Sequence, residues 1–175
     1  MSPFQEALKL VFEYEGVYSD HANDSGGATK YGITQKVARS FGYKDDMIAF
    51  PKYIAETIYY EQYWKPMGLD EIGKIHPEVA VECFECGVNM GNKTAVKFLQ
   101  QSLNSMNRDK RMRNLMVDGS SGKKTLRELR RISNNDVYTL VKMQNVLQGA
   151  RYITLSQRNK NLKVFIRGWF KRVML

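Results

Sequence analysis

The apolar residues at the start of the chain recur at helical spacing, beginning with Phe4 and Leu8. Ser2 is a favoured N-cap residue, and Pro3 suits the first helical position, where a backbone N–H would have no partner inside the helix. Gly16 is typical of a residue that follows a helix end. The pattern therefore predicts a first helix that begins near Pro3 and stops near Gly16.

The following segment is rich in glycine, aspartate, asparagine, serine and threonine, and its tightest turn signal is Ser25-Gly26-Gly27. Short segments around 17–19 and 29–33 have the composition of β-strands. We expect these two strands to pair as a small hairpin. Thr34 is then a suitable N-cap for a second helix that runs to about Phe41.

The remainder of the chain shows helical patterns separated by proline, glycine and polar connections. No internal repeat, low-complexity tract or flexible linker interrupts them. The sequence therefore predicts a mainly α fold, a single domain over residues 1–175 with the small β-hairpin near its start. The further helices are predicted from Pro51 to before Pro66, from Pro77 to Gly91, from Thr94 to Leu103, and over approximately 123–132, 136–158 and 161–173.

Length, hydropathy and charge narrow the class of protein. A chain of 175 residues can bury a core without disulfides or metals, and no apolar run approaches the ~18 residues of a membrane span. Residues 110–175 carry 16 Lys and Arg against 3 acidic residues, whereas residues 1–109 carry 11 against 15. This asymmetry suggests attraction to an anionic polymer such as nucleic acid, lipid headgroups or peptidoglycan, although a solvated helix face would show the same charges.

The N-terminus and the cysteines bear on the compartment. The N-terminus lacks an uninterrupted apolar core of about 7 residues, so it does not resemble a signal peptide, and we expect synthesis in the cytoplasm. Cys83 and Cys86 lie three residues apart on one face of a predicted helix, where a mutual disulfide is geometrically awkward. A redox or zinc half-site is the alternative, and we predict buried free thiols.

Glu15 is the most informative residue for chemistry. It lies at i+4 from Val11 and at i+7 from Leu8, so it continues the apolar stripe of the first helix, whereas Glu6 and Glu13 do not. A carboxyl on an apolar face is partly desolvated, which disfavours its charged form. A glutamic acid that keeps its proton near neutral pH can act as a general acid. A helix-end cap is the alternative, although a carboxylate there opposes the helix dipole.

A second carboxylate, Asp24, follows nine residues later in the predicted hairpin. Glycoside hydrolysis usually needs such a pair, in which one group protonates the leaving oxygen and the other activates water or stabilises the cationic sugar. Thr29, across the glycine turn, could orient a water molecule or the Asp24 carboxylate. Aspartate is also common before Ser-Gly-Gly as a turn residue, so the spacing alone leaves both interpretations open.

Two stretches carry a family resemblance. Residues 15–18 read Glu-Gly-Val-Tyr, and residues 24–34 read Asp-Ser-Gly-Gly-Ala-Thr-Lys-Tyr-Gly-Ile-Thr. Together they closely resemble the signature of glycoside hydrolase family 108, N-acetylmuramidases that occur as phage endolysins and as secretion-associated muramidases of Gram-negative bacteria. The layout Glu-x8-Asp-x4-Thr is also similar to the triad of phage-type lysozymes.

Later segments extend the resemblance over nearly the whole chain. Residues 58–64 look like the family's Tyr-Trp helix, and residues 88–91 resemble its Val-Asn-x-Gly helix end. Residues 92–175 resemble the family's predicted peptidoglycan-binding part. Two departures are Val17, where the family usually has a second glycine, and the loop at 20–23, which reads Asp-His-Ala-Asn where the family often has Asp-Pro-Asp. Neither departure removes a catalytic group, but both could change the hairpin geometry or the fit to the substrate.

The resemblance implies a lysozyme-like helical fold and hydrolysis of the β-1,4 bond between N-acetylmuramic acid and N-acetylglucosamine in peptidoglycan. It maps the general acid onto Glu15, the second carboxylate onto Asp24 and a supporting hydroxyl onto Thr29. Tyr18 and Tyr31 flank the predicted hairpin, where they either contact sugar rings or pack against the helices.

Asn89 is interpreted through the resemblance as a hydrogen-bond partner of an N-acetyl group, with a helix C-cap as the alternative. Trp64 and Trp169 are predicted to lie in the core. We expect an enzyme that needs no metal or cofactor. We also expect a monomer that binds peptidoglycan glycan strands, with no nucleic-acid partner and no stable membrane insertion. It would act in the periplasm after holin-type release or dedicated secretion.

Two other functions stay open on the sequence alone. A lytic transglycosylase acting on the same bond would need only Glu15 and would yield an anhydro-sugar product. A non-catalytic basic protein that binds the cell wall would account for the charge asymmetry but not for the arrangement of Glu15, Asp24 and Thr29.

Overall fold

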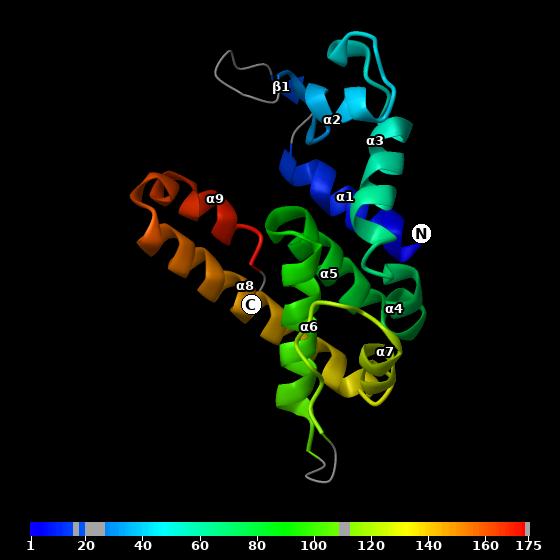
Figure 1. Cartoon of the computed structure of the whole chain (residues 1–175), viewed down its shortest axis with the longest axis vertical. Helices are drawn as coiled ribbons and strands as arrows, with labels where there is room; N and C mark the ends of the chain where they lie inside the picture. The colour runs from blue at the N-terminus through cyan, green and yellow to red at the C-terminus, as the bar shows by residue number, and fades with distance from the viewer. Residues whose placement is uncertain (16–17, 20–26, 109–112, 174–175) are drawn as a thin grey trace.

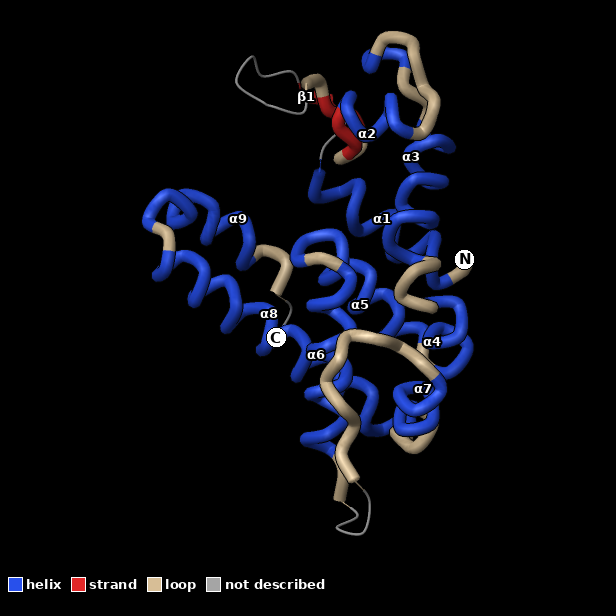
Figure 2. Tube along the Cα trace, viewed as in Figure 1, coloured by secondary structure: helices blue, strands red, loops and turns tan. Residues whose placement is uncertain are grey.

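The computed structural model describes residues 1–15, 18–19, 27–108 and 113–173, with the backbone alone at residues 14, 15, 18 and 19. Helices account for most of the described chain, and the strands are short (Figure 2). The α-helices are α1 (Pro3–Glu15), α2 (Gln35–Ser40), α3 (Lys52–Tyr59), α4 (Leu69–Ile75), α5 (Pro77–Met90), α6 (Asn92–Met106), α7 (Lys123–Leu129), α8 (Val137–Arg158) and α9 (Ile166–Phe170). The strands are β1 (Tyr18–Ser19), β2 (Thr29–Lys30) and β3 (Ile33–Thr34), and the other helical turns are η1 (Met47–Ala49), η2 (Tyr60–Trp64), η3 (Asn134–Asp136) and η4 (Lys160–Phe165).

The predicted helix boundaries are confirmed where capping residues mark them. At the start of α1, the Ser2 hydroxyl accepts a hydrogen bond from the Gln5 backbone N–H at 3.3 Å, and the Gln5 side chain accepts one from the Ser2 N–H at 3.0 Å. This reciprocal pair is a capping box. The Thr34 hydroxyl caps α2 by accepting from the Val37 N–H, and α5 begins at Pro77 as the sequence predicts.

The predicted hairpin is a sheet of three short antiparallel strands in the order β1-β2-β3. The segment expected to be one strand over 29–33 is divided by a tight turn at Tyr31 and Gly32, whose φ angles are 53° and 74°. Two consecutive positive φ angles are the geometry of the turn that matches strand twist in a two-residue hairpin. The turn was not anticipated because tyrosine rarely adopts positive φ.

Two other helical predictions need correction. The short helix α4 was missed in the interval between Pro66 and Pro77, where Gly68 at φ 62° separates it from the preceding turn. The single helix expected over 161–173 is a 3-10 segment, η4, followed by the five-residue α9. Asn159 favours this start, because its side chain accepts a hydrogen bond from the Asn161 N–H at 3.0 Å.

The helix α5 lies at the centre of the fold, in contact with α1, α4, α6 and α8. Its Phe84 side chain is fully buried among aromatic rings, including that of Trp64 at a centroid distance of 5.6 Å. Trp64 is 1% exposed, which confirms its predicted core position, whereas Trp169 is only half-buried on α9. Cys83 and Cys86 are free and buried, as predicted.

Figure 1 shows that α8 and α9 run side by side and form an arm that projects from the body of the molecule. The strands and α2 lie together at one end of the body, beside α3 and the last turn of α1. Within the part of the chain that the structure describes, no helix is both long and apolar enough to span a bilayer.

Candidate active site

The helix α1 ends at Glu15, the residue that the sequence nominates as the general acid. Leu8 and Val11 on its apolar stripe are 4% and 3% exposed, and Glu13 is exposed. The stripe therefore faces the interior, as predicted, and Glu15 follows on from it at the helix end. The Glu15 side chain lies outside the described atoms, so its role as the acid stays a prediction.

The sheet brings Thr29 beside the chain that leaves α1. Strand β1 begins three residues after Glu15, and its Ser19 is paired with Thr29 of β2. The Thr29 side chain is half-buried, and its hydroxyl donates a long hydrogen bond of 3.5 Å to the Gly27 carbonyl oxygen. A bond of that length is weak, so the hydroxyl can reorient at little cost. Asp24 lies outside the described residues.

The turn at Tyr31 is held from two sides. The buried Tyr59 of α3 donates a hydrogen bond from its hydroxyl to the Tyr31 carbonyl oxygen at 3.1 Å. The Phe12 ring of α1 lies 5.6 Å from the Tyr31 ring and 5.9 Å from the Tyr59 ring, so the three rings join α1, α3 and the β2–β3 turn. Tyr31 thus packs against helices while remaining half-exposed, and a sugar contact from this ring stays a prediction.

Tyr18 and Asn89 are the other two residues assigned to substrate binding. The backbone of Tyr18 lies in β1 opposite Lys30, and its side chain is outside the described atoms. Asn89 occupies the last turn of α5, where its amide donates to the Glu85 carbonyl oxygen at 2.8 Å. This bond lies inside the helix, and contact between Asn89 and an N-acetyl group remains a prediction.

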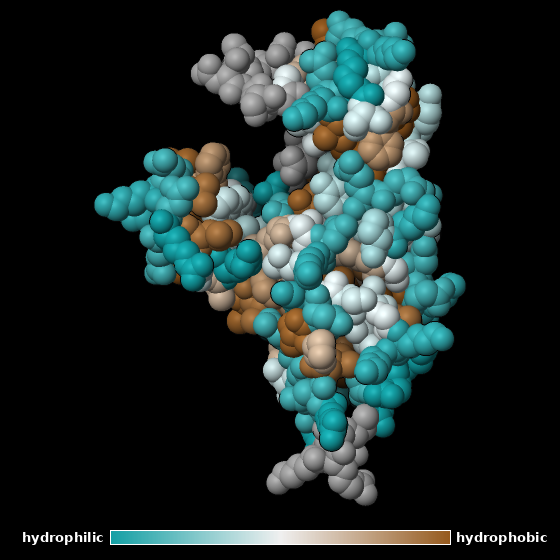
Figure 3. Space-filling model, in the orientation of Figure 1, coloured by the Kyte–Doolittle hydropathy of each residue, from teal (hydrophilic) through white to brown (hydrophobic). Residues whose placement is uncertain are grey.

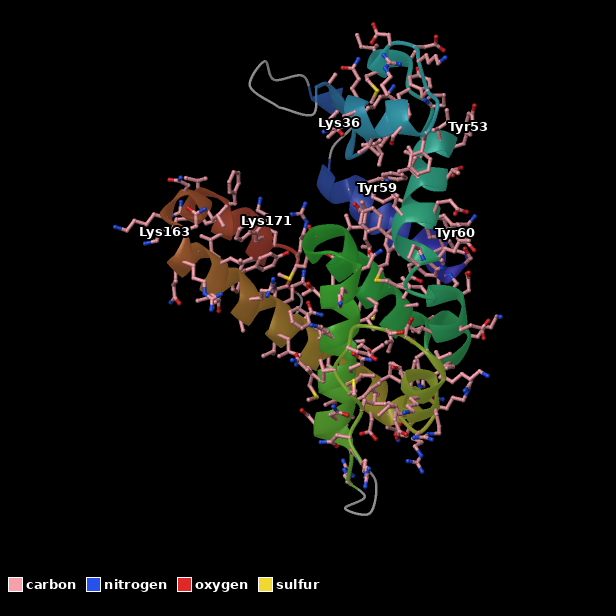
Figure 4. The ribbon with its side chains drawn as sticks, in the orientation of Figure 1. Lys36, Tyr53, Tyr59, Tyr60, Lys163 and Lys171 are labelled. Carbon is pink, nitrogen blue, oxygen red and sulfur yellow. The ribbon has the colours of Figure 1, made fainter. Side chains whose placement is uncertain are left out.

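A hollow in the molecular surface separates the end that carries α2 and the strands from the arm of α8 and α9 (Figure 3). The C-terminal end of α1 points toward this hollow (Figure 1). Lys36 of α2 lies on one side of it and Lys171, just after α9, lies on the other (Figure 4). The predicted acid therefore belongs to a helix end that approaches a concave surface with exposed cations on both sides.

Two carboxyl groups that sequence reasoning overlooked are buried between α5 and α8. Glu82 and Glu85 are each 3% exposed. Burial, reinforced by the charge of Glu85, raises the pKa of Glu82 to about 8, against a hydrogen bond from Asn145 that lowers it. Burial raises the pKa of Glu85 to about 7, and the Arg172 charge opposes this. Side chains this enclosed offer no surface to a polysaccharide, so we do not consider them as the acid.

The described residues contain no cluster of three or more His, Cys, Asp or Glu side chains with the arrangement of a metal site. The buried thiols also lack the setting of reactive cysteines. Burial raises the pKa of both Cys83 and Cys86, and the Cys83 thiol donates to the Gln144 side-chain oxygen at 3.2 Å. We interpret these cysteines as packing groups.

Comparison with known proteins divides the chain into two matched regions. Residues 8–91 match the model described as glycosyl hydrolase 108, and residues 94–174 match a predicted peptidoglycan domain. Among solved structures, SagA of Brucella abortus is similar to the whole arrangement, with a TM-score of 0.67 and 28% sequence identity. The similarity covers 97% of this chain and 88% of the SagA chain. The search of curated proteins found no match.

Proposed function

We propose that this chain, which belongs to the glycosyl hydrolase 108 family, cleaves the β-1,4 bond between N-acetylmuramic acid and N-acetylglucosamine, with Glu15 as general acid. The chain is a glycoside hydrolase that acts on peptidoglycan. The observation that carries the finer proposal is the buried stripe of α1, which ends at Glu15 beside the strand pairing that holds Thr29.

Two features of the α1 backbone support a protonated Glu15 in this proposal. By helical spacing the residue continues the stripe of Leu8 and Val11, whose side chains are buried, and desolvation on such a face disfavours a charged carboxylate. It is also the last residue of the helix, where the partial negative charge of the unpaired carbonyl groups opposes an added anion. A carboxyl that retains its proton near neutral pH can protonate the glycosidic oxygen as the bond breaks.

Asp24 and Thr29 complete the proposed reaction. In this proposal, ionised Asp24 activates a water molecule or stabilises the positive charge that develops on the sugar. Thr29 orients the water, and its weak bond to the Gly27 carbonyl supports this role because the hydroxyl can exchange that partner for a water molecule. Tyr18, Tyr31 and Asn89 are proposed to contact the sugars. The chemistry needs neither a metal nor a cofactor.

We further propose that residues 1–175 form one lysozyme-like domain whose part 92–175 holds the substrate. The 16 cations of residues 110–175 would attract the carboxylates of the wall, so adsorption should weaken as salt rises. The proposed setting is the periplasm, reached by holin-type release or dedicated secretion, and the proposed working form is a monomer without a nucleic-acid partner.

Mass spectrometry of fragments released from purified sacculi tests the reaction. A muramidase adds one water per cleaved bond, whereas a lytic transglycosylase yields anhydro-muramic ends without water. Glu15→Gln should abolish release, and Glu13→Gln, an exposed carboxyl on the same helix, should leave it unchanged. A fully active Glu15→Gln variant would exclude Glu15 as the acid. Anhydro products with a mild effect of Asp24→Ala would replace the muramidase proposal with the transglycosylase.

A further inference from the structure

The arm that projects from the body is purely cationic. From Val137 to the last residue the sequence contains eight Lys and Arg and no Asp or Glu. Five of these cations lie between 160 and 172, on η4, α9 and the turn that follows. A segment without acidic residues of its own carries a net positive charge, which is complementary to a dense anionic surface.

The outer face of η4 and α9 combines these cations with an exposed aliphatic side chain. Val164 is 77% exposed, and Lys163, directly before it, and Arg167, three residues after it, are exposed as well. Lys160 precedes Val164 at i−4 and is also exposed. Phe165 and Phe170 on the same segment are 54% and 39% exposed, and several apolar side chains left in water amid cations indicate a surface that is covered when a partner is present.

The arm holds this face rigidly. The Trp169 ring stacks on the buried Tyr152 of α8, with centroids 4.9 Å apart and planes 21° apart. The Phe165 ring also stacks on the Trp169 ring, with centroids 6.1 Å apart and planes 25° apart. Phe165 is itself 54% exposed. The internal stack therefore fixes the orientation of η4 and α9 on α8, and Phe165 adds an exposed aromatic edge next to Val164. Figure 3 shows the apolar surface that gathers on the arm beside hydrophilic residues.

We propose that the outer face of η4 and α9 binds reversibly to the surface of a membrane rich in anionic lipid. The boundary between headgroups and acyl chains accepts aliphatic and aromatic side chains while lipid phosphates bind lysine and arginine. A glycan would also accept the cations through its carboxylates, but it removes less of the apolar surface of Val164 from water than the acyl-chain boundary does. The exposed apolar side chains amid the cations therefore favour lipid as the partner of this face, while the cations of residues 110–158 remain available to the wall polymer.

Vesicle co-sedimentation of the full chain tests the proposal, using phosphatidylcholine alone and with 30% phosphatidylglycerol added (about a third anionic lipid, enough for a strong surface potential). Wild type should bind the anionic vesicles at least about tenfold more tightly, and high salt should remove most of the difference. Lys163→Gln combined with Arg167→Gln should weaken this binding by about tenfold or more. Val164→Ser should weaken it by about threefold.

Gly168 allows a gain-of-binding variant. It is exposed on the same face as Val164, at i+4, and a side chain there would meet no atom within 4 Å. Gly168→Leu should strengthen vesicle binding about threefold, because it adds apolar surface without disturbing the arm. Gly168→Gln is the matched control for the gain in helix propensity. Tyr138→Ser removes an exposed aromatic ring, with Lys142 above it, at the other end of α8. This variant should leave vesicle binding unchanged.

The fluorescence of Trp169 gives a second readout, because Trp64, the only other tryptophan in the sequence, is 1% exposed. Anionic vesicles should shift the emission to the blue, and Trp169→Phe should remove the shift. Equal binding to both vesicle types would overturn the proposal. Loss of sacculus adsorption by the arm variants, with their vesicle binding unchanged, would also overturn it and would indicate that the arm binds the wall. Vesicles contain no glycan, so these outcomes are independent of the proposed hydrolysis.

Discussion

The two sides of α5 are built on opposite physical principles. Toward α1, α3 and η2 the helix presents Phe84, which is fully buried, and the rings of Phe4, Tyr59, Tyr63 and Trp64 lie around it at centroid distances of 5.6–6.5 Å. Toward α8 it presents Glu82, Cys83 and Glu85. There the Asn145 amide donates to the Glu82 carboxyl at 2.7 Å, and the Cys83 thiol donates to Gln144.

The difference separates a side whose contribution to stability is independent of pH from a side whose contribution depends on pH. The aromatic side gains free energy from buried area and ring packing, neither of which depends on pH. The polar side includes two carboxyl groups whose protonated form is favoured by burial. It is also where α5, the last helix of residues 8–91, meets α8 of residues 94–174. The contact between α5 and α8 is therefore the pH-dependent part of the junction, to which α6 also contributes.

Removing the centre of the aromatic side should have the largest effect. Phe84→Ala deletes a ring at 0% exposure with four aromatic neighbours, so we expect a loss of about 3–5 kcal/mol in the free energy of unfolding. Urea unfolding followed by circular dichroism measures it. Because no ionisable group is involved, the loss should be equal at pH 5.5 and pH 8.5. A loss that changes markedly with pH would contradict the division between the two sides.

Raising the pH should weaken the polar side. Glu82 and Glu85 have folded-state pKa values of about 8 and about 7, above the ordinary 4.5, so the folded chain binds more protons than the unfolded chain between these limits. The stability that these two carboxyl groups contribute should therefore be fully present below about pH 4.5. It should fall as pH rises and be lost above about pH 8. For Glu82 alone we expect a loss on the order of 4 kcal/mol across this range.

Thermal unfolding of wild type and Glu82→Gln across this pH range measures the effect. The glutamine is uncharged, so the variant should show a smaller decline with pH than wild type. Glu78→Gln, an exposed carboxyl in the first turn of α5, is the control and should keep the wild-type slope. Cys86 and Arg172 also face these carboxyls, and they are unchanged in both variants. Identical slopes in wild type and Glu82→Gln would exclude Glu82 as the source.

Asn145 should matter more when Glu82 is charged. Asn145→Ala removes the amide that donates to Glu82 and should cost about 1–3 kcal/mol, since a buried oxygen loses its donor. This hydrogen bond lowers the pKa of Glu82, so its loss raises the pKa further. The cost should therefore be greater at pH 8.5 than at pH 5.5, as urea titrations of the variant would reveal. A cost independent of pH would indicate that Asn145 contributes by packing alone.

The aromatic and polar sides of α5 also show which features could be predicted from the sequence. Helix α5 was predicted because Pro77 and Gly91 mark its ends, and the inward face of α1 followed from the spacing of Leu8 and Val11. Local patterns of this kind are visible along the chain. The polar interface was missed because Glu82 is buried only by α8, whose Asn145 lies 63 residues away.

In the candidate site too, the features that depend on long-range contacts could not be predicted from the sequence. The strand pairing near Glu15 was expected from composition, but its division at Tyr31 depends on a contact with Tyr59, 28 residues later. Without that hydrogen bond, nothing local favours a tyrosine with φ of 53°. The segment 161–173 was also misjudged as one helix, because the 3-10 start of η4 depends on the Asn159 cap and on packing against α8. Long-range contacts set these details, and periodicity does not contain them.

The substitution Tyr59→Phe, which should give the smallest change in stability, tests a polar contact between the aromatic side and the candidate site. Tyr59→Phe removes only the hydroxyl that donates to the Tyr31 carbonyl oxygen. We expect a loss of about 1 kcal/mol in the free energy of unfolding. Lytic activity should fall by about fivefold, because the released turn carries β2, on which Thr29 lies beside the end of α1.

Tyr60→Phe is the matched control, since the neighbouring hydroxyl donates to Asp70 of α4 at 2.8 Å, on the far side of α3 from the strands (Figure 4). Both variants lose one hydrogen bond and keep the ring, so their stabilities should be similar. Activity should separate them, with Tyr60→Phe close to wild type. Equal activities would mean that the aromatic side supports the fold without positioning the strands. A selective loss in Tyr59→Phe would extend the role of this side from stability to the geometry of catalysis.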